Sequence, residues 1–308
     1  MTNYIIRRLI IAFITLILSV IGVGLLIHVV PGDPVMVMLG MNGGSATTEQ
    51  IENMRRVLGL DQPVWIQTLD YVIGVFSGDL GTSMFTNEPV RETLFKVLPN
   101  TLALAFSAML IAIGVGLPIG FFAAYNHNSW IDRLLMVVAV LGVSIPQFWL
   151  GLIFLLFFSL TLRWLPVAGE DYRSLILPAF TLGITYAAIV ARMTRSVMID
   201  VFSEDFIRTA RAKGLPESIV LLRHALKPSL IAVITIIGVV FGYLMGGAVV
   251  IENVFAWNGI GRLALEAVLR RDYPMIQGFI LIFATVIVLM SILMDLAYAW
   301  LDPRITYD

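Results

Sequence analysis

Apolar residues gather into six long runs that are separated by shorter polar stretches. The runs cover about 9–30, 101–125, 134–160, 175–198, 229–251 and 275–301. A helix needs about 20 consecutive apolar residues to cross a bilayer, and every run reaches that length. The pattern therefore predicts an all-α polytopic membrane protein with six transmembrane helices.

The composition strengthens this prediction. The mean hydropathy is +0.91, with 59% hydrophobic and 13% charged residues, whereas soluble domains have about 25% charged residues. A soluble globular class is therefore excluded. The chain has no Cys, and its three histidines lie far apart in the sequence, so no clustered metal ligands are expected.

The distribution of basic residues predicts the orientation. Arg7 and Arg8 precede a run that is too long for a signal peptide, so we expect an uncleaved first span over 9–30. Six spans place both termini on one side, and eleven of the 20 Lys and Arg residues fall on that side, seven of them within 192–228. Positive residues favour the cytoplasm. We expect cytoplasmic termini, a cytoplasmic loop at 192–228 and an extracytoplasmic segment at 31–100.

The segment 31–100 has its own helical pattern. Thr47 and Gln50 form a capping-box signature, and Gly59 is placed to end that helix. A second helix is expected after Pro63. It groups apolar residues at helical spacing: Trp65, Leu69, Val72, Ile73 and Phe76. These two helices either lie on the outer membrane surface or pack on the bundle as a lid, and the sequence leaves both open.

The stretch "EDFIRTARAKGLPESIVLLRHALKP" (204–228) is the most densely charged part of the chain. Ser203 is predicted to cap a helix that Gly214 ends. A second helix is predicted from Pro216 to Lys227, with basic residues in its last turn. The sequence therefore predicts a helix pair joined by a sharp turn.

The first of these helices has two faces. Phe206, Ile207 and Ala210 are expected to dock, while Arg208 and other basic residues project elsewhere. An ordinary cytoplasmic loop would also be basic. A loop that only sets the membrane topology does not need two capped helices or a string of small residues. These features favour a surface that a partner protein approaches closely.

The same stretch resembles the cytoplasmic coupling loop of ABC importer permeases, in the dipeptide, oligopeptide and nickel transport family. Further motifs resemble that family in the same order along the chain: "PGDP" (31–34), "GDLGTS" (78–83), "SIPQFWLG" (144–151), "ILPAFTLG" (176–183), "GGAVVIENVFAWNGIGR" (246–262), "RDYP" (271–274) and "LDPRI" (301–305). The resemblance spans essentially the whole chain.

This resemblance implies one permease domain over 1–308, with a transmembrane core at 101–301, in a bacterial inner membrane. It implies three kinds of partner: a second permease that is a paralogue of this one, two ABC ATPase subunits and an extracytoplasmic solute-binding protein. It also implies import of di- or oligopeptides or a peptide-like solute, with nickel or a metal chelate as the alternative. The implied ATPase-coupling residues are Arg208, Thr209, Ala210, Arg211, Ala212, Lys213, Gly214 and Leu215.

The resemblance also implies that this chain is not an enzyme and carries no cofactor, because ATP and Mg²⁺ would bind the ATPase subunits. The sequence agrees, since it contains no G-x-x-x-x-G-K-[ST] phosphate loop. A secondary transporter, the alternative from another class, would need mid-membrane coupling charges and usually an internal repeat. Neither is found in the sequence.

Glycines and a few polar residues stand out within the spans. Gly238, Gly242 and Gly246 are four residues apart on one helical face, a spacing that suits helix packing or a translocation path. Glu252 and Asn253, at the outer mouth of the same span, are candidates for contact with solute or binding protein.

The ionisable residue Asp295 lies inside the last run. Such residues are costly in a membrane and are usually paired, so we predict an ion pair with Arg192 or Arg195 rather than a proton-carrying role. Pro118, Pro146 and Pro178 mark expected kinks.

Overall fold

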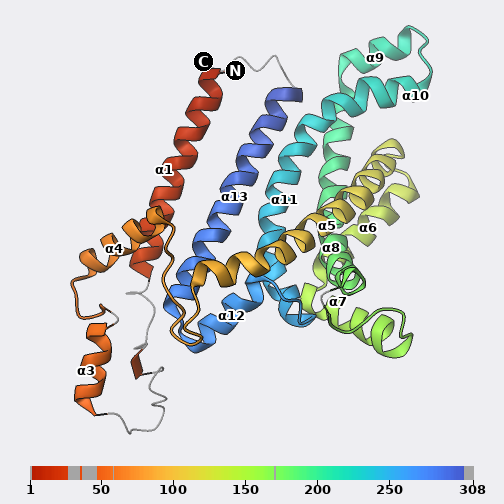
Figure 1. Ribbon diagram of the computed structural model, residues 1–308. Helices are drawn as coiled ribbons and strands as arrows, with labels where there is room; N and C mark the ends of the chain where they lie inside the picture. The colour runs from red at the N-terminus through yellow and green to blue at the C-terminus, as the bar shows by residue number, and fades with distance from the viewer. Residues whose placement is uncertain (1, 27–34, 37–46, 58, 170, 302–308) are drawn as a thin grey trace. The chain divides into compact units, whose positions relative to one another are not determined.

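The computed structural model describes residues 2–26, 35–36, 47–57, 59–169 and 171–301, and helices dominate them (Figure 1). Within these ranges there is no β-sheet, only an isolated bridge between Thr82 and Pro89. The all-α prediction is confirmed. The motifs at 31–34 and 302–305, and His28, lie outside the described residues.

Five of the predicted spans appear as single long helices. They are α1 (Thr2–Leu26), α5 (Val90–Tyr125), α8 (Tyr172–Ser203), α11 (Leu226–Val254) and α13 (Tyr273–Leu301). Several extend beyond the apolar runs, and α5 begins eleven residues before position 101. Hydropathy detects only the part of a helix that suits lipid, whereas helical hydrogen bonding continues through polar residues such as Arg91 and Glu92.

The third span is not the single helix that the apolar run 134–160 suggested. The chain forms α6 (Trp130–Ser144), then α7 (Gln147–Phe154) and the π-helix η1 (Leu155–Thr161), with a bend of 96° at the break. Pro146 causes the break, because it lacks an N–H and forces the preceding Ile145 into extended backbone (φ −81°, ψ 124°). The kink predicted at Pro146 is confirmed, while Pro118 and Pro178 lie inside the continuous helices α5 and α8.

Contacts divide the described chain into two compact units. The first contains 101–257 and 290–301, and the second contains 2–100 and 258–289. Helices α5 and α13 contribute residues to both units. We describe each unit by itself.

In the first unit, the backbones of α5 and α8 touch. A Cβ atom on Gly116 of α5 would lie 2.6 Å from the carbonyl oxygen of Ala187 on α8, and one on Gly120 would collide with the carbonyl of Ala191. From the other side, a Cβ on Gly183 would lie 2.8 Å from the carbonyl of Ala108. In lipid, small residues spaced four apart allow this approach and the dispersion contacts that come with it.

The second unit is built around residues from α5, α13 and α12 (Ile260–Arg270). Leu94, Ile260 and Tyr273 are completely or almost completely buried there. Two motifs far apart in sequence meet in this unit, because Ser83 Oγ donates to Asp272 Oδ2 over 2.5 Å and Met84 N–H donates to Asp272 Oδ1 over 3.2 Å. Helix α12 had no counterpart among the sequence predictions.

The two predicted helices of 31–100 are confirmed as α3 (Thr48–Val57) and α4 (Val64–Ser77). Thr47 N–H donates to Gln50 Oε1 (3.0 Å) and Gln50 N–H donates to Thr47 Oγ1 (3.3 Å), which is the reciprocal capping box. Gly59 has a φ of +66°, as the predicted helix stop requires.

Helix α4 packs on α1 through Thr68, whose Cγ2 would lie 3.0 Å from a Cβ on Gly24. The opposite face of α4 is apolar and exposed: Trp65 is 68%, Leu69 51%, Ile73 58% and Phe76 62% exposed. Of the apolar residues grouped by the sequence, only Val72 contributes to the core of the second unit.

We predict that Gly120→Val destabilises the first unit. The added side chain would collide with the α8 backbone, and such overpacking costs about 1–3 kcal/mol. The melting temperature of the detergent-solubilised protein should fall by several degrees. Gly114→Val is the matched control, because a Cβ at Gly114 on the same helix meets no atom within 4 Å. Equal melting temperatures for the two variants would contradict the contact.

Candidate functional site

The candidate site begins where α8 ends and α9 (Asp205–Ala212) starts. Ser203 does not cap α9 as predicted. It is the last residue of α8, and its hydroxyl donates to the carbonyl of Asp200 (2.7 Å). Because the backbone of Ser203 is still helical, Glu204 (φ −68°, ψ 146°) takes the N-cap position, without a side-chain capping bond.

Helix α9 is anchored by an apolar cluster of the first unit. Ile207 is 0% and Ala210 5% exposed, and they pack with Met198 of α8, Ala124 of α5 and Val220. Phe206 was expected on this docking face but is 44% exposed. Ile207 and Ala210 are three residues apart and share one helix face, whereas Phe206 lies one step around the helix.

The eight predicted coupling residues divide between two environments. Ala210 is buried, and Leu215 is partly buried against the same apolar cluster. The other six are exposed, along α9 or in the turn that follows it: Arg208, Thr209, Arg211, Ala212, Lys213 and Gly214. Helices α9 and α10 lie together at one end of α8 (Figure 1). Within α9, the buried residues Ile207 and Ala210 anchor one face, and the remaining coupling residues of this helix are exposed around it.

Gly214 forms the turn after α9. It has a φ of +73°, and its N–H donates to the carbonyl of Arg211 over 2.9 Å. Glycine adopts this left-handed conformation without steric cost. A Cβ at Gly214 would meet no atom within 4 Å of it, so the position is open on its outer side.

An ion pair that the sequence analysis missed spans this turn. Arg211 Nη2 donates to Glu217 Oε1 (2.7 Å) and Arg211 Nε donates to Glu217 Oε2 (3.2 Å). The hydrogen bond with Glu217 raises the pKa of Arg211, and the bidentate geometry fixes the guanidinium plane. Arg208 pairs with Asp205 at 3.6 Å, but both side chains are largely exposed, so that pair contributes little.

The second helix does not end at Arg223, His224 and Lys227 as predicted. Helix α10 (Glu217–Ile219) continues into the π-helix η2 (Val220–Ala225) and then into α11 without a loop. Pro228, in the first turn of α11, has no N–H to donate to the carbonyl of His224, and the wider π turns end just before it, at Ala225. The turn at Gly214 is thus followed by an unbroken helical path into a membrane-spanning helix.

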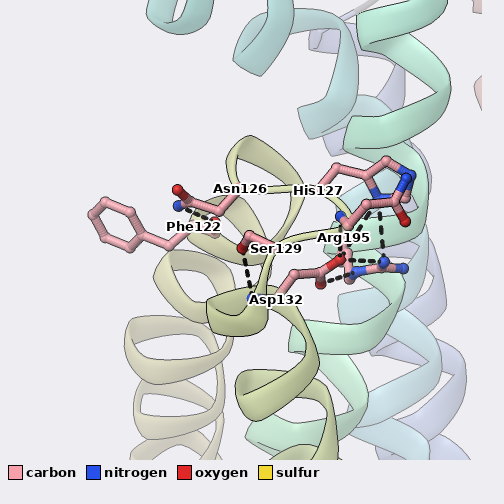
Figure 2. A network of polar contacts seen from close by, with 7 residues as sticks. Phe122, Asn126, His127, Ser129, Asp132 and Arg195 are labelled. Carbon is pink, nitrogen blue, oxygen red and sulfur yellow. Dashed lines mark hydrogen bonds and ion pairs between the residues drawn. The ribbon is translucent and has the colours of Figure 1, made fainter.

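A polar network ties α6 to α8 in the same unit, and the sequence analysis did not foresee it (Figure 2). Arg195 Nε donates to Asp132 Oδ1 (2.6 Å) and Arg195 Nη2 to Asp132 Oδ2 (2.7 Å). His127 Nδ1 lies 3.3 Å from Arg195 Nη2 and 3.6 Å from Asp132 Oδ2. The Asp132 side chain is 3% exposed and the Arg195 side chain 25%, so this bidentate ion pair is partly buried.

The turn before α6 completes this network. Ser129 Oγ accepts from the backbone N–H of Asp132 (3.2 Å), and the N–H of Asn128 donates to Asp132 Oδ2 (3.0 Å). The stretch "SWID" (129–132) carries the S-x-x-D signature of a helix start, and that signal would have drawn attention to Asp132.

Arg195 therefore binds Asp132 and is not the partner that Asp295 was predicted to have. Asp295 is buried at 7% exposure, and Arg192 is exposed on α8. The pair between Asp295 and Arg192 stays a prediction.

The three predicted glycines of α11 have different surroundings. A Cβ on Gly238 would lie 2.9 Å from Met294 of α13, which makes Gly238 a packing residue. Gly242 and Gly246 have nothing within 4 Å of an added Cβ. That stretch of α11 is open, and Tyr243 beside it is 59% exposed.

Glu252 and Asn253 do not form one exposed pair. Glu252 is 0% exposed, and Thr101 Oγ1 donates to its Oε1 over 2.5 Å. Asn253 is partly buried, and its amide donates to the carbonyl of Val249. In this conformation Glu252 joins α11 to α5 rather than facing a solute.

No group of three or more His, Asp or Glu side chains within the described ranges is arranged to hold a metal ion. The described residues present two other surfaces: the basic surface of α9, which Ile207 and Ala210 anchor, and the open face of α11 at Gly242 and Gly246.

Comparison with protein families places these features in context. Residues 116–307 match the model of the "Binding-protein-dependent transport system inner membrane component", and residues 1–105 match the N-terminal model of the same kind of component. The chain is 42% identical over 308 residues, covering all of both chains, to the glutathione transport system permease protein GsiC of Salmonella typhimurium. The protein of that name from Escherichia coli K12 gives the same identity and coverage.

Solved structures with a similar fold come from ABC transporters. One chain of the MetNI methionine ABC transporter, in an inward facing conformation, superposes with a TM-score of 0.57 at 15% identity, over 68% of this chain and 96% of that chain. An amino acid ABC transporter solved with histidines gives 0.52 at 18% identity, over 68% and 94%. At these identities the likeness is one of fold.

We predict that Asp132→Asn destabilises the protein by about 2 kcal/mol, because it leaves the partly buried guanidinium of Arg195 without its carboxylate partner. Adding Arg195→Gln should restore part of the loss, which a double-mutant cycle of thermal stabilities in detergent measures. Asp205→Asn, which breaks an exposed pair with Arg208, should cost at most about 1 kcal/mol. If Asp132→Asn costs no more than this control, the network does not stabilise the fold.

Proposed function

The chain belongs to the family of inner membrane components of binding-protein-dependent transport systems, and from this premise we propose that it carries a peptide-like solute inward. It is a multi-pass permease subunit of an ABC importer. The observation that carries the solute class is the full-length similarity to permeases named for glutathione transport, since glutathione is itself a small peptide. Neither nickel import nor secondary transport has comparable support.

The proposed transport needs other chains. A second permease, a paralogue of this one by family analogy, two ABC ATPase subunits and an extracytoplasmic binding protein would complete the importer. ATP would be hydrolysed with Mg²⁺ in the ATPase subunits. The absence of a phosphate-loop motif in this sequence supports that division of labour.

We assign ATPase coupling to the exposed face of α9 and its turn. Its basic side chains and the open position at Gly214 suit close approach by a partner, while Ile207 and Ala210 fix the helix to α5 and α8. Movement imposed on this surface would pass to the membrane helices as a rigid-body change. This assignment needs the cytoplasmic orientation that the basic residues predict.

We assign the translocation path to the open face of α11. Gly242 and Gly246 leave space on that face, which either a solute or the second permease would fill. The single permease domain over 1–308 remains our proposal, supported by the contribution of α5 and α13 to both compact units.

The direct test is to purify the tagged chain in mild detergent, identify the chains that copurify, and reconstitute the assembly in vesicles. We expect a second permease and a P-loop ATPase to copurify. Adding the binding protein should give ATP-dependent uptake of a radiolabelled dipeptide or glutathione. Purification of the chain alone, or uptake that is independent of ATP, would overturn the proposal.

A substitution at Gly214 distinguishes two roles of this residue, which are to end α9 and to let the ATPase approach closely. Asn tolerates the left-handed conformation, and the position is sterically open, so Gly214→Asn should fold with its turn intact while adding a side chain to the surface. We predict at least a tenfold loss of copurified ATPase, equivalent to about 1.4 kcal/mol.

Gly59→Asn is the matched control. Gly59 has a similar φ of +66° and equally open surroundings, but it follows α3 in the segment expected outside the cell. ATPase recovery should be unchanged in this variant. Equal recovery with Gly214→Asn would mean that Gly214 only ends the helix.

A further inference from the structure

We propose that a groove in the second unit, formed by α4, α5 and α13, binds one anionic phospholipid. An acyl chain would lie in the groove and the phosphate would lie on Arg91. This site is separate from the coupling and translocation roles assigned above.

The groove is a pocket of about 410 Å³, within the range of roughly 300–1,000 Å³ that is usual for small-molecule sites. Its walls are apolar. They include Val75 from α4, Leu98 from α5, and Leu281, Ile282 and Val286 from α13. The hydroxyl of Thr285, which also lines the groove, donates to the carbonyl of Leu281 within α13 (2.8 Å). The walls therefore offer mainly dispersion contacts, as a hydrocarbon chain requires.

Arg91 supplies the only full charge among the residues that line this pocket. Within the described part of the chain its guanidinium donates to the carbonyl of Gly78 (3.4 Å) and contacts no carboxylate. Arg91 lies in the first turn of α5, where the helix dipole disfavours a cation. Helix stability therefore does not explain its position, whereas a bound anion would.

The surroundings of the groove indicate that the occupant comes from the bilayer. Phe95 and Leu289 at its border are each 54% exposed, and the exposed face of α4 includes Phe76 at 62%. The α13 wall belongs to the apolar stretch Tyr273–Ala297, which is long enough to cross a membrane. We therefore expect lipid acyl chains, rather than water, to surround the groove.

The chemistry of the groove selects an amphipathic molecule with one anionic head. A guanidinium binds phosphate oxygens through two parallel N–H donors, and one basic residue near a membrane surface contributes about 1 kcal/mol toward anionic lipid. Phosphatidylglycerol has this phosphate and a net negative charge. Phosphatidylcholine has the same chains without the net charge.

The test is native mass spectrometry of the detergent-purified full chain, with any copurifying subunits, after delipidation and titration with phosphatidylglycerol or phosphatidylcholine of equal acyl length. We expect one phosphatidylglycerol bound about fivefold more tightly than phosphatidylcholine, as about 1 kcal/mol implies. Arg91→Gln should abolish this preference, and Arg91→Lys should retain part of it. Lys96→Gln is the matched control, because Lys96 is an exposed cation on the same helix and does not line the pocket.

A second variant tests the groove itself. Val286→Phe should fill the space and weaken binding of both lipids by a similar factor. No preference for phosphatidylglycerol in the wild type, or an unchanged preference in Arg91→Gln, would overturn the proposal. Cysteine cross-linking from Leu98→Cys to a second permease in native membranes would also overturn it, because a protein helix would then occupy the groove.

Discussion

The backbone contact between α5 and α8 is the constraint on which the first unit depends. The carbonyls of Ala187 and Ala191 lie so close to Gly116 and Gly120 that no side chain would fit there. In lipid the hydrophobic effect does not drive helices together, so the association depends on such close packing. Helix α8 then carries Arg195, which holds α6, and Met198, which holds α9 through Ile207. A membrane-buried contact therefore determines where the basic surface of α9 is presented.

Features set by local chemistry were predictable from the sequence. Thr47 and Gln50 specify a helix start through neighbouring hydrogen bonds, and the glycines at 59 and 214 end helices because their backbone conformation excludes most other residues. Five of the six apolar runs predicted a single long helix correctly for the same reason. Each of these signals is contained within a few turns of chain.

Features that depend on distant partners were not predictable in this way. Hydropathy predicted that 134–160 crosses the membrane, but it did not predict the size of the bend at Pro146, which is 96°. Arg195 was one of the two partners predicted for Asp295, yet it binds Asp132, which is 63 residues away in sequence. Glu252 looked accessible at the end of a span but is enclosed by α5. Partner choice depends on helix packing, which a single chain's periodicity does not specify.

The π-helical segment Val220–Ala225 sets the rotation, about the helix axis, between the turn at Gly214 and the face of α11 that carries Gly242 and Gly246. Each of its hydrogen bonds spans one residue more than in an α-helix, and one residue corresponds to about 100° of rotation. The direction in which the turn at Gly214 points is therefore linked to the direction of the open face at Gly242 and Gly246. The number of residues between them is as tightly constrained as their identity, so insertions or deletions here would turn one surface away from the other without disturbing either.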